Sequence, residues 1–230
     1  SRTVPFVSKS TGVPLAKIAA RIMAGEKLAD LHLPADDREF DYFCVKEAVM
    51  PFGRFPGSDV VLGPEMKSTG EVMGIAGNFP AAFTKTQLAI DYEPPRGGEV
   101  FISVNDGDKR NITAIARSIA RLGFSLVATT GTARALRASG IECEEVGKIH
   151  AGSHTILDRI ASGEIVLMIN TPFGSSTNTD GYEMRAACVR HGVSYCTTLA
   201  GAQALIAGME AVRETGLDVI ALQDLPQWEG

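Results

Sequence analysis

The sequence predicts an α/β protein with a mainly parallel sheet in its second part and a shorter, irregular α+β segment before it. Two observations support this fold class. After residue 98, short apolar runs alternate with segments of helical periodicity, which is the pattern of a parallel sheet covered by helices on both faces. Before that point, apolar runs are broken by prolines and glycines and do not form a convincing independent fold.

A linker separates the two parts near residues 91–98. Pro94 and Pro95 are adjacent there, and so are Gly97 and Gly98. Such pairs interrupt both helices and strands. We therefore expect one domain over residues 1–93 and a second over residues 94–230, and a chain of 230 residues is long enough to hold two small domains.

The first part contains one clear helix signal, over residues 14–24. Leu15 and Ile18 share its apolar face, Pro14 lies in its first turn, and Gly25 suits its end. The other expected elements of this part are strands over residues 40–50 and 60–62 and a helix over residues 80–88.

In the second part, strands and helices alternate at regular spacing, and no internal repeat is present. The expected strands cover residues 100–104, 125–129, 141–146, 165–170, 193–197 and 218–222. The expected helices cover residues 110–122, 132–139, 156–161, 183–191 and 202–213.

Composition excludes several classes of partner. The formal net charge is -5 and no basic run is interleaved with aromatics, so a nucleic acid is not an expected partner. No apolar run approaches the roughly 20 residues that span a bilayer, and the first residues do not form a signal peptide. The four cysteines are widely spaced, which is typical of reduced thiols in a cytoplasmic protein. His150 and His154 have a metal-ligand spacing, but Gly152 between them disfavours a helix, and we predict no metal site.

Polar residues follow the predicted strands at their carboxyl ends, where ligands bind in open α/β sheets. Lys109 follows the first strand, Thr129 and Thr132 flank Gly131 after the second, and Asn170 ends the fourth. Hydroxyls, a lysine and the backbone N–H groups of helix starts all favour a phosphate group. Lys148 after the third strand and Thr197 after the fifth belong to the same edge.

Each of these residues has a simpler explanation. Thr129 and Thr132 can cap a helix, Lys109 can be a solvated surface charge, and Asn170 can hold a turn. The convergence of five loops on one sheet edge favours the anion site over these separate explanations.

Catalysis has weaker support in the sequence. Neither a dinucleotide-binding glycine motif, nor a P-loop, nor a nucleophile-elbow motif is present. Asp106, Asp108 and His150 are the nearest acid–base candidates, with Asp158 expected on a helix face. Turn formation explains Asp106 and Asp108 adequately. We therefore predict no catalytic residue in this chain.

At these residues the chain resembles the methylglyoxal-synthase-like domain, and more closely the version that ends the large subunit of carbamoyl-phosphate synthetase. The matching stretches, in order, are residues 103–109 (SVNDGDK), 128–133 (ATTGTA), 163–164 (GE), 169–171 (INT) and 197–201 (TTLAG). Residues 1–17 and 62–74 (LGPEMKSTGEVMG) are similar to the end of the second ATP-grasp half of that enzyme. The resemblance covers nearly the whole chain.

The resemblance implies a Rossmann-like regulatory domain preceded by an incomplete ATP-grasp segment, at the end of a larger cytoplasmic ligase. That ligase makes carbamoyl phosphate from bicarbonate, glutamine-derived ammonia and two ATP with Mg (or Mn), for pyrimidine and arginine synthesis. Its implied partner is a glutamine amidotransferase small subunit. The implied effectors are UMP, IMP and ornithine. No cofactor is expected in this part of the enzyme, and the part alone is expected to be inactive.

Carried over residue by residue, the resemblance implies a nucleotide-phosphate site, an ornithine-proximal residue and a residue flanking the ATP-grasp site. The phosphate site would consist of Ser103, Lys109, Thr129, Thr132, Lys148, Asn170 and Thr171. Thr197 would lie near ornithine, and Arg2 would flank the nucleotide and metal of the ligase.

Three departures from the family pattern bear on function. Ser153 stands where methylglyoxal synthases carry their catalytic Asp, so no carboxylate is placed to abstract a proton from dihydroxyacetone phosphate. Pro172 replaces a usual threonine of the regulatory domain and removes a hydroxyl donor. Ser175 and Ser176 occupy a stretch that is often basic, and a neutral loop there would weaken anion binding.

Three functions follow from these observations. The first is a regulatory binding module attached to a ligase segment. The alternative is a methylglyoxal-synthase-type phosphate lyase, which methylglyoxal formation from dihydroxyacetone phosphate would reveal. A third reading is a domain that mainly makes contacts in a homo-oligomer.

Overall fold

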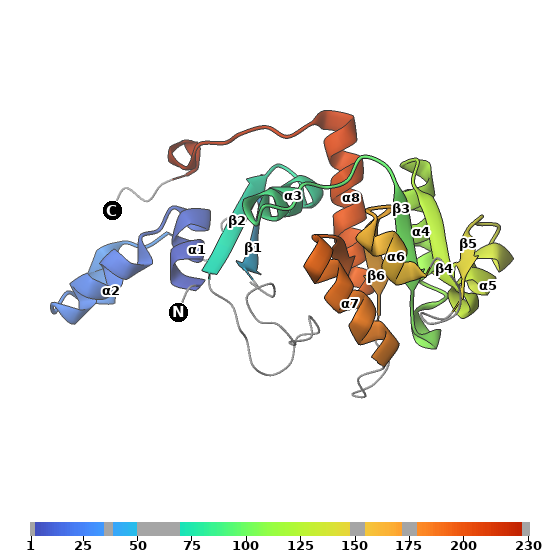
Figure 1. The fold of residues 1–230 in the computed structure, drawn as a ribbon. Coiled ribbons are helices and arrows are strands. Elements are labelled where there is room, and N and C mark those ends of the chain that lie inside the picture. The colour runs from blue at the N-terminus through green and yellow to red at the C-terminus, as the bar shows by residue number, and fades with distance from the viewer. Residues whose placement is uncertain (1–2, 35–38, 50–69, 148–154, 172–178, 227–230) are drawn as a thin grey trace. The chain divides into compact units, whose positions relative to one another are not determined.

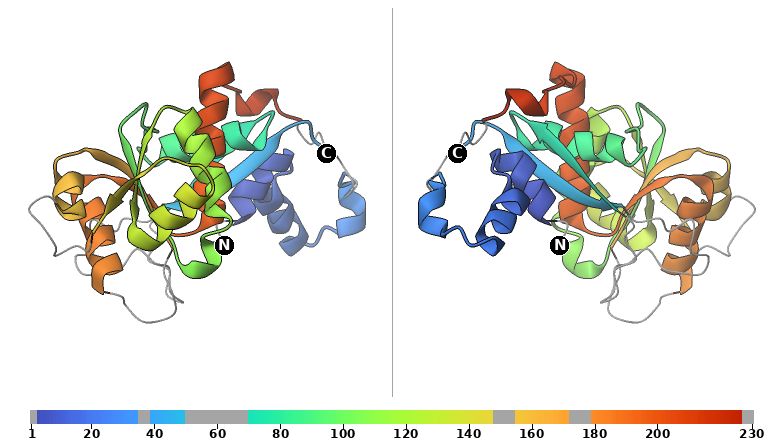
Figure 2. Two further views of the ribbon diagram at one scale, coloured as in Figure 1. Left: turned by 90° about the vertical axis from the view of Figure 1, so that its right-hand side faces the viewer. Right: turned by 90° about the vertical axis from the view of Figure 1, so that its left-hand side faces the viewer.

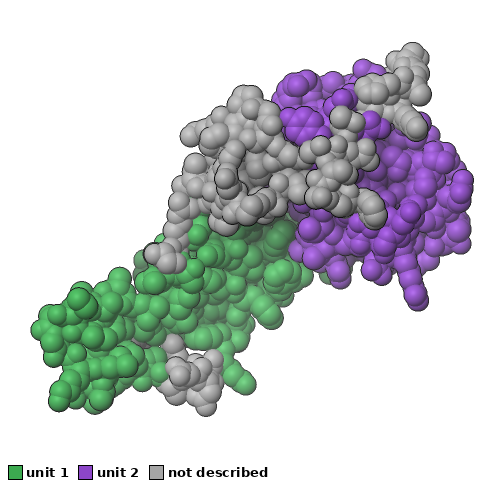
Figure 3. Space-filling view, turned by 90° about the horizontal axis from the view of Figure 1, so that it is seen from below, with its two compact units in different colours: residues 1–49, 69–91, 211–230 green, residues 50–68, 92–210 purple. Residues whose placement is uncertain are grey.

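The computed structural model describes residues 3–34, 39–49, 70–147, 155–171 and 179–226 (Figure 1). The chain forms two compact units, coloured separately in Figure 3. The first comprises Ser1–Val49, Thr69–Asp91 and Ala211–Gly230, and the second Met50–Ser68 and Tyr92–Glu210. Compactness and homology can divide a chain differently, so the expected domains 1–93 and 94–230 stay a prediction.

The second unit is built on a five-stranded sheet of order β5-β4-β3-β6-β7, in which every neighbouring pair is parallel. Val100, Phe101 and Ile102 of the central strand have no exposed surface. Continuous apolar strands of this kind are expected where helices cover both faces of a sheet. The strands are β3 Glu99–Ser103, β4 Ser125–Thr129, β5 Glu144–Val146, β6 Ile165–Asn170 and β7 Ser194–Cys196.

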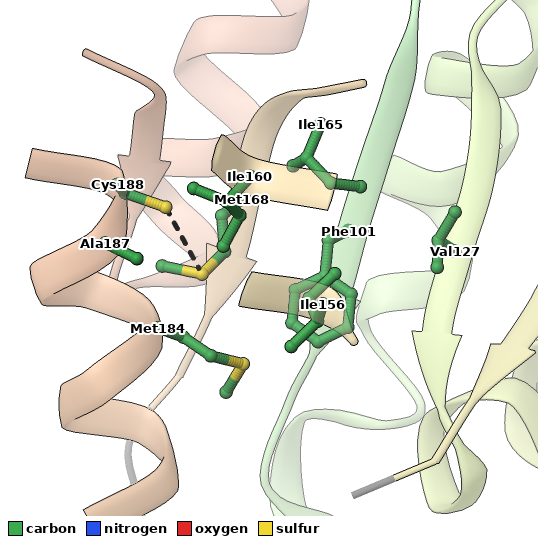
Figure 4. Packing of buried hydrophobic residues seen from close by; sticks show 9 residues of the cluster. All are labelled: Phe101, Val127, Ile156, Ile160, Ile165, Met168, Met184, Ala187 and Cys188. Carbon is green, nitrogen blue, oxygen red and sulfur yellow. Dashed lines mark hydrogen bonds between the residues drawn. The ribbon is translucent and has the colours of Figure 1, made fainter. Parts of the chain in front are cut away.

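In the described part of the second unit, five α-helices connect these strands or follow them, on the two faces of the sheet (Figure 2). On one face, Ile156 and Ile160 of α6 and Met184 and Cys188 of α7 pack against Phe101 in a single apolar cluster (Figure 4). On the other face, α4 lies beside α8, and an ion pair joins the two helices. The helices are α4 Ile112–Arg121, α5 Thr130–Ala138, α6 Ile156–Ala161, α7 Thr179–His191 and α8 Leu199–Thr215, with a short 3-10 turn, η3, at Asp106–Asp108.

The first unit contains an antiparallel pair of strands, β1 Phe43–Val49 and β2 Gly70–Ala76, covered by α3 Phe79–Ala89. Gly74 of β2 is required by this packing, because a Cβ atom there would lie 2.0 Å from the carbonyl oxygen of Ala82. The other elements of this unit are α1 Thr3–Thr11, α2 Leu15–Met23 and two 3-10 turns, η1 Leu28–Leu31 and η4 Leu222–Asp224.

The segment after α8 differs from the prediction. The sequence predicts a strand over residues 218–222, but this segment is not a strand and ends in the turn η4. Val219 is 97% exposed and the segment pairs with no described strand, so its apolar residues do not form the buried face of a strand. Leu217 instead packs against the cluster of Ala76, Ala81 and Ala82, and Lys85 forms an ion pair with Asp218 at 3.4 Å.

Two further elements of the first unit were not predicted. β2 contains Gly70 and Gly74, which weaken the sequence signal of a strand. Helix α1 begins with Thr3, Val4 and Pro5, a run with low helix propensity. The predicted helices over 14–24 and 80–88 are present as α2 and α3, and the predicted strand over 40–50 is present as β1. The predicted strand over 60–62 lies outside the described residues.

A buried arginine joins three elements at the amino-terminal edge of the sheet. Arg159 of α6 has a side chain that is 6% exposed, and its guanidinium contacts Glu99 of β3 at 2.5 Å and Glu144 of β5 at 2.6 Å. Glu144, the largest influence, and Glu99 raise the pKa of Arg159. Because a guanidinium forms paired hydrogen bonds with carboxylates, this contact fixes α6 across three strands of the sheet.

We expect Arg159→Leu to lower the free energy of unfolding by about 2–3 kcal/mol, because the buried guanidinium's charge-assisted hydrogen bonds to the partly buried Glu99 and the exposed Glu144 are lost. The matched control is Arg137→Leu, which removes an exposed ion pair with Glu145 at 2.9 Å. Such pairs contribute at most about 1 kcal/mol. Urea unfolding of the two variants measures the difference, and equal losses would contradict the structural role of Arg159.

Candidate functional site

The candidate site lies where the chain connections from the sheet diverge. From β3 the chain crosses to β4, and from β6 it crosses to β7 on the opposite side. β3 and β6 are neighbours, and Ser103 pairs with Asn170 at their carboxyl ends. In open α/β sheets this switch point leaves a crevice in which ligands bind. Ser103 and Asn170 are therefore at the centre of the sheet edge that the sequence analysis selected.

The start of α5 borders this crevice. Thr129 is the residue before the helix, and its side chain makes no capping hydrogen bond to the first turn. Its hydroxyl instead lies 3.4 Å from the Ser103 hydroxyl and 3.4 Å from the Thr132 hydroxyl. The simpler explanation of Thr129 as a side-chain cap is therefore wrong. The first-turn N–H groups of α5 keep their capacity to bind an anion.

The hydroxyl oxygens of two buried threonines accept hydrogen bonds from other residues of the chain. Thr132 Oγ1 accepts a hydrogen bond from the backbone N–H of Val104 at 3.2 Å. Thr171 Oγ1 accepts two, from the backbone N–H of Asn105 at 3.1 Å and from Asn105 Nδ2 at 3.0 Å. A threonine hydroxyl has two acceptor positions and one donor hydrogen. Thr171 is thus left only its donor hydrogen, which suits a ligand that accepts hydrogen bonds.

Lys109 brings a positive charge to the same helix start. It follows η3, and a Cβ atom at Gly131 would lie 2.8 Å from Lys109 Nζ. The ammonium group therefore lies directly over the first turn of α5, where the helix dipole is also positive. Asp106 contacts Lys109 Nζ at 2.5 Å, and its own side chain is 89% exposed. Through this hydrogen bond and its charge, Lys109 lowers the pKa of Asp106.

The described residues at this sheet edge thus supply an ammonium group, threonine hydroxyls, an asparagine amide and the N–H groups of a helix start. These groups donate hydrogen bonds or carry positive charge, which is the chemistry of a phosphate or carboxylate site.

No group of three or more His, Cys, Asp or Glu side chains that could hold a metal ion occurs within the ranges the structure describes. Among the helices described, none is long and apolar enough to cross a membrane.

The structure brings six of the predicted site residues together. These are Ser103, Lys109, Thr129, Thr132, Asn170 and Thr171. Thr197 is the residue after β7, whose last residue, Cys196, pairs with Ile169 of β6. Lys148 and Arg2 lie outside the described residues. So do His150, Ser153, His154, Pro172, Ser175 and Ser176.

The acid–base candidates have other partners in the described part of the chain. Asp106 pairs with Lys109, and Asp108 accepts a hydrogen bond from Asn105 Nδ2 at 2.6 Å. Asp158 belongs to the first turn of α6, where it forms a capping box with Thr155. Turn and cap formation account for Asp108 and Asp158, and the ion pair accounts for Asp106.

Arg185 of α7 is a further polar residue at this site that was not predicted from the sequence. This side chain is 4% exposed, and its Nη1 donates a hydrogen bond to Asn170 Oδ1 at 2.8 Å. A signal for it exists in the sequence, because Arg185 is in helical phase with the buried residues Gly181 and Cys188. A charged residue on the buried face of a helix indicates a polar partner inside the domain.

Comparison with known protein families defines the class of the second unit. Residues 111–197 match the MGS-like domain. This match lies within the second unit, and the parallel five-stranded sheet agrees with it. The crystal structure of methylglyoxal synthase from Elizabethkingia anophelis NUHP1 covers 49% of this chain and 78% of its own, at 18% identity and a TM-score of 0.40. A likeness of this size supports no further conclusion.

Curated relatives identify the larger family. The chain is 48% identical over 224 residues to the carbamoyl phosphate synthase large chain of Myxococcus xanthus, covering 97% of this chain and 21% of that protein. It is 50% identical over 230 residues to the C-terminal section of the large chain in Methanopyrus kandleri, covering 98% of this chain and 42% of that protein. The chain therefore spans less than half the length of these relatives. It contains an MGS-like domain and belongs, as a C-terminal fragment, to the carbamoyl phosphate synthase large chains.

We expect Asp106→Asn to strengthen phosphate binding about twofold to fivefold at neutral pH, because the anion no longer competes with an exposed carboxylate for Lys109. Lys109 lowers the pKa of Asp106, so this carboxylate stays ionised at neutral pH and only substitution removes the competition. Isothermal titration with inorganic phosphate measures the effect. Glu142→Gln changes the net charge equally at an exposed position of the same unit, and a gain of the same size in this control would contradict the explanation.

Proposed function

We propose that this chain is the regulatory part of a carbamoyl phosphate synthase large chain, and that its second unit binds the phosphate group of a nucleotide effector. The observation that carries the proposal is the set of donors at the carboxyl ends of β3, β4 and β6. Lys109 lies over the uncapped start of α5, and the Thr171 hydroxyl has only its donor hydrogen left. An anion bound there would receive hydrogen bonds from rigid elements of the sheet edge.

The proposed parent enzyme is a ligase that makes carbamoyl phosphate from bicarbonate, glutamine-derived ammonia and two ATP, for pyrimidine and arginine synthesis. The names of the relatives support this proposal, and a large chain implies a small-subunit partner, here a glutamine amidotransferase. Mg (or Mn) and ATP belong to the catalytic part of the parent in this proposal. The described residues offer no fitting set of metal ligands, so no step of the reaction is assigned to them.

The proposed effectors are UMP and IMP at the phosphate site and ornithine near Thr197. A nucleoside monophosphate carries the anionic group that Lys109 and the start of α5 favour. In this proposal Ser103, Thr129, Thr132 and Asn170 provide polar groups around it, and Lys148 adds a second positive charge. Arg2 would flank the ATP-grasp site of the parent.

A phosphate lyase acting on dihydroxyacetone phosphate is the weaker candidate. Such an enzyme needs a carboxylate free to remove a proton beside the bound phosphate. Ser153 stands in the corresponding sequence position, and Asp106 and Asp108 have the partners described above. The relatives carry the name of the synthase and agree with the regulatory function.

We expect UMP or IMP at about 100 times its dissociation constant to stabilise the protein by about 2.7 kcal/mol. For a domain of this size the melting temperature rises by about 5–10 °C. Lys109→Met should abolish most of this rise, since a charge-assisted hydrogen bond contributes about 1.5–3 kcal/mol. Thermal unfolding with each nucleotide, ornithine and dihydroxyacetone phosphate measures the shifts.

The matched control is Arg110→Met, which removes one positive charge at the neighbouring exposed residue. A rise that is equal in the Lys109 variant and the wild type would contradict the proposed site. Methylglyoxal formation from dihydroxyacetone phosphate would establish the lyase instead. Self-association without a response to any of these ligands would favour a role in oligomer contacts.

A further inference from the structure

Arg185 connects helix α7 to the candidate site through Asn170. Both side chains are buried, with 4% of Arg185 and 6% of Asn170 exposed. Arg185 Nη1 donates to Asn170 Oδ1 at 2.8 Å, and Asn170 Nδ2 donates to the backbone carbonyl of Ser103 at 3.1 Å. A chain of two hydrogen bonds therefore runs from the helix, through the amide, to the end of β3.

These two partners allow one orientation of the Asn170 amide. A guanidinium group only donates hydrogen bonds, and a backbone carbonyl only accepts them. If the amide were flipped, its NH₂ group would face the donors of Arg185, and its oxygen would face the oxygen of Ser103. Two buried polar contacts would be lost, which is unfavourable because each would leave a buried group unsatisfied. With the amide fixed, one of the two Nδ2 hydrogens is bound to Ser103, and within the part of the chain that the structure describes the second has no acceptor.

The first turn of α7 leaves space for this contact. A Cβ atom at Gly181 would lie 2.9 Å from Arg185 Nη1 and 3.6 Å from Asn170 Oδ1. Glycine is unfavourable inside a helix, by about 1 kcal/mol relative to alanine. The close approach of the guanidinium and the amide accounts for a glycine at this position.

The location of Asn170 gives the contact a consequence for binding. Asn170 pairs with Ser103 in the register of β3 and β6, and the Ser103 hydroxyl contacts Thr129 before α5. We propose that Arg185 is a positioning residue of the phosphate site: it fixes the Asn170 amide so that its remaining Nδ2 hydrogen donates to the bound ligand. This inference rests on the proposed function, because it names a residue through which the same site acts.

The test uses four single variants of the full chain and one double variant, Arg185→Gln with Asn170→Ala, with UMP as the probe and isothermal titration as the measurement. Arg185→Gln removes the guanidinium, and Gly181→Ala keeps it but displaces it from Asn170. Arg190→Gln is the matched control, because it removes one positive charge from an exposed position of the same helix. Asn170→Ala removes the group through which Arg185 acts.

We expect Arg185→Gln to weaken UMP binding at least about tenfold, the loss that follows from an unsatisfied buried polar group. Gly181→Ala should weaken binding in the same direction, although alanine favours a helix. Arg190→Gln should bind as the wild type does. In the Asn170→Ala background, Arg185→Gln should cost less than about twofold, because interacting residues are not additive.

Wild-type affinity in both Arg185→Gln and Gly181→Ala would overturn the inference. So would a loss in Arg185→Gln of the same size with and without Asn170, since Arg185 would then act independently of the amide. If Arg185→Gln does not fold, the affinity of Gly181→Ala alone tests the inference, and wild-type affinity in this variant would overturn it.

A second measurement is independent of the ligand. The side-chain NH₂ resonances of Asn170, identified by their loss in Asn170→Ala, report whether the amide is held. Altered positions and faster exchange with water in Gly181→Ala or Arg185→Gln, but not in Arg190→Gln, would support the positioning role. Unchanged resonances would overturn it even if UMP fails to bind the wild type. That failure alone would count against the proposed function.

Discussion

The pairing of β3 with β6 is the interaction on which the rest of the second unit depends. The two strands are adjacent although the described residues between them include the strands β4 and β5 and the α-helices α4, α5 and α6. Their register places Ser103 beside Asn170, and Thr171 donates its backbone N–H to the Ser103 carbonyl at 3.2 Å. Since the connections leave these strands in opposite directions, the crevice between them stays open at the carboxyl ends. The apolar cluster around Phe101 and Met168 stabilises this pairing from one face of the sheet.

Electrostatics explain why this crevice favours an anion. Lys109 places its ammonium charge over the start of α5, where the positive end of the helix dipole also lies. Asp106 balances this charge from an exposed position. A ligand that replaces one exposed carboxylate exchanges a weak surface contact for several hydrogen bonds.

Much of this site could be predicted from the sequence, because it depends on local patterns. The alternation of apolar runs and helical segments located the ends of β3, β4 and β6, and hence Lys109, Thr129 and Asn170, whereas Ser103 was implied only by the family resemblance. Parallel strands have their carboxyl ends at one edge, so these residues had to converge. The prediction was wrong where an apolar run has no neighbouring strand to pair with. The run over 218–222 has the apolar content of a strand but pairs with no described strand.

Other features depend on contacts that the sequence does not encode locally. β2 forms despite Gly70 and Gly74. The glycine at position 74 is needed there, because α3 approaches so closely that a Cβ atom at Gly74 does not fit. Arg185 was missed for a similar reason. A charged residue on a helix is usually exposed, so the helical phase of Arg185 with Cys188 was a weak signal, and its burial beside Asn170 depends on the position of α7. Likewise, the lone pairs of Thr171 are occupied by Asn105, a residue 66 positions earlier in the chain.

The central claim is that phosphate binds at the start of α5, beneath Lys109. The most direct measurement is a titration of the ¹⁵N-labelled chain with inorganic phosphate and with UMP, followed through the backbone amide resonances. We predict that the largest shifts fall on Gly131 and Thr132 in the first turn of α5, with smaller shifts at Thr171. Saturable shifts confined to residues outside the ends of β3, β4 and β6, or no saturable shift at all, would contradict it.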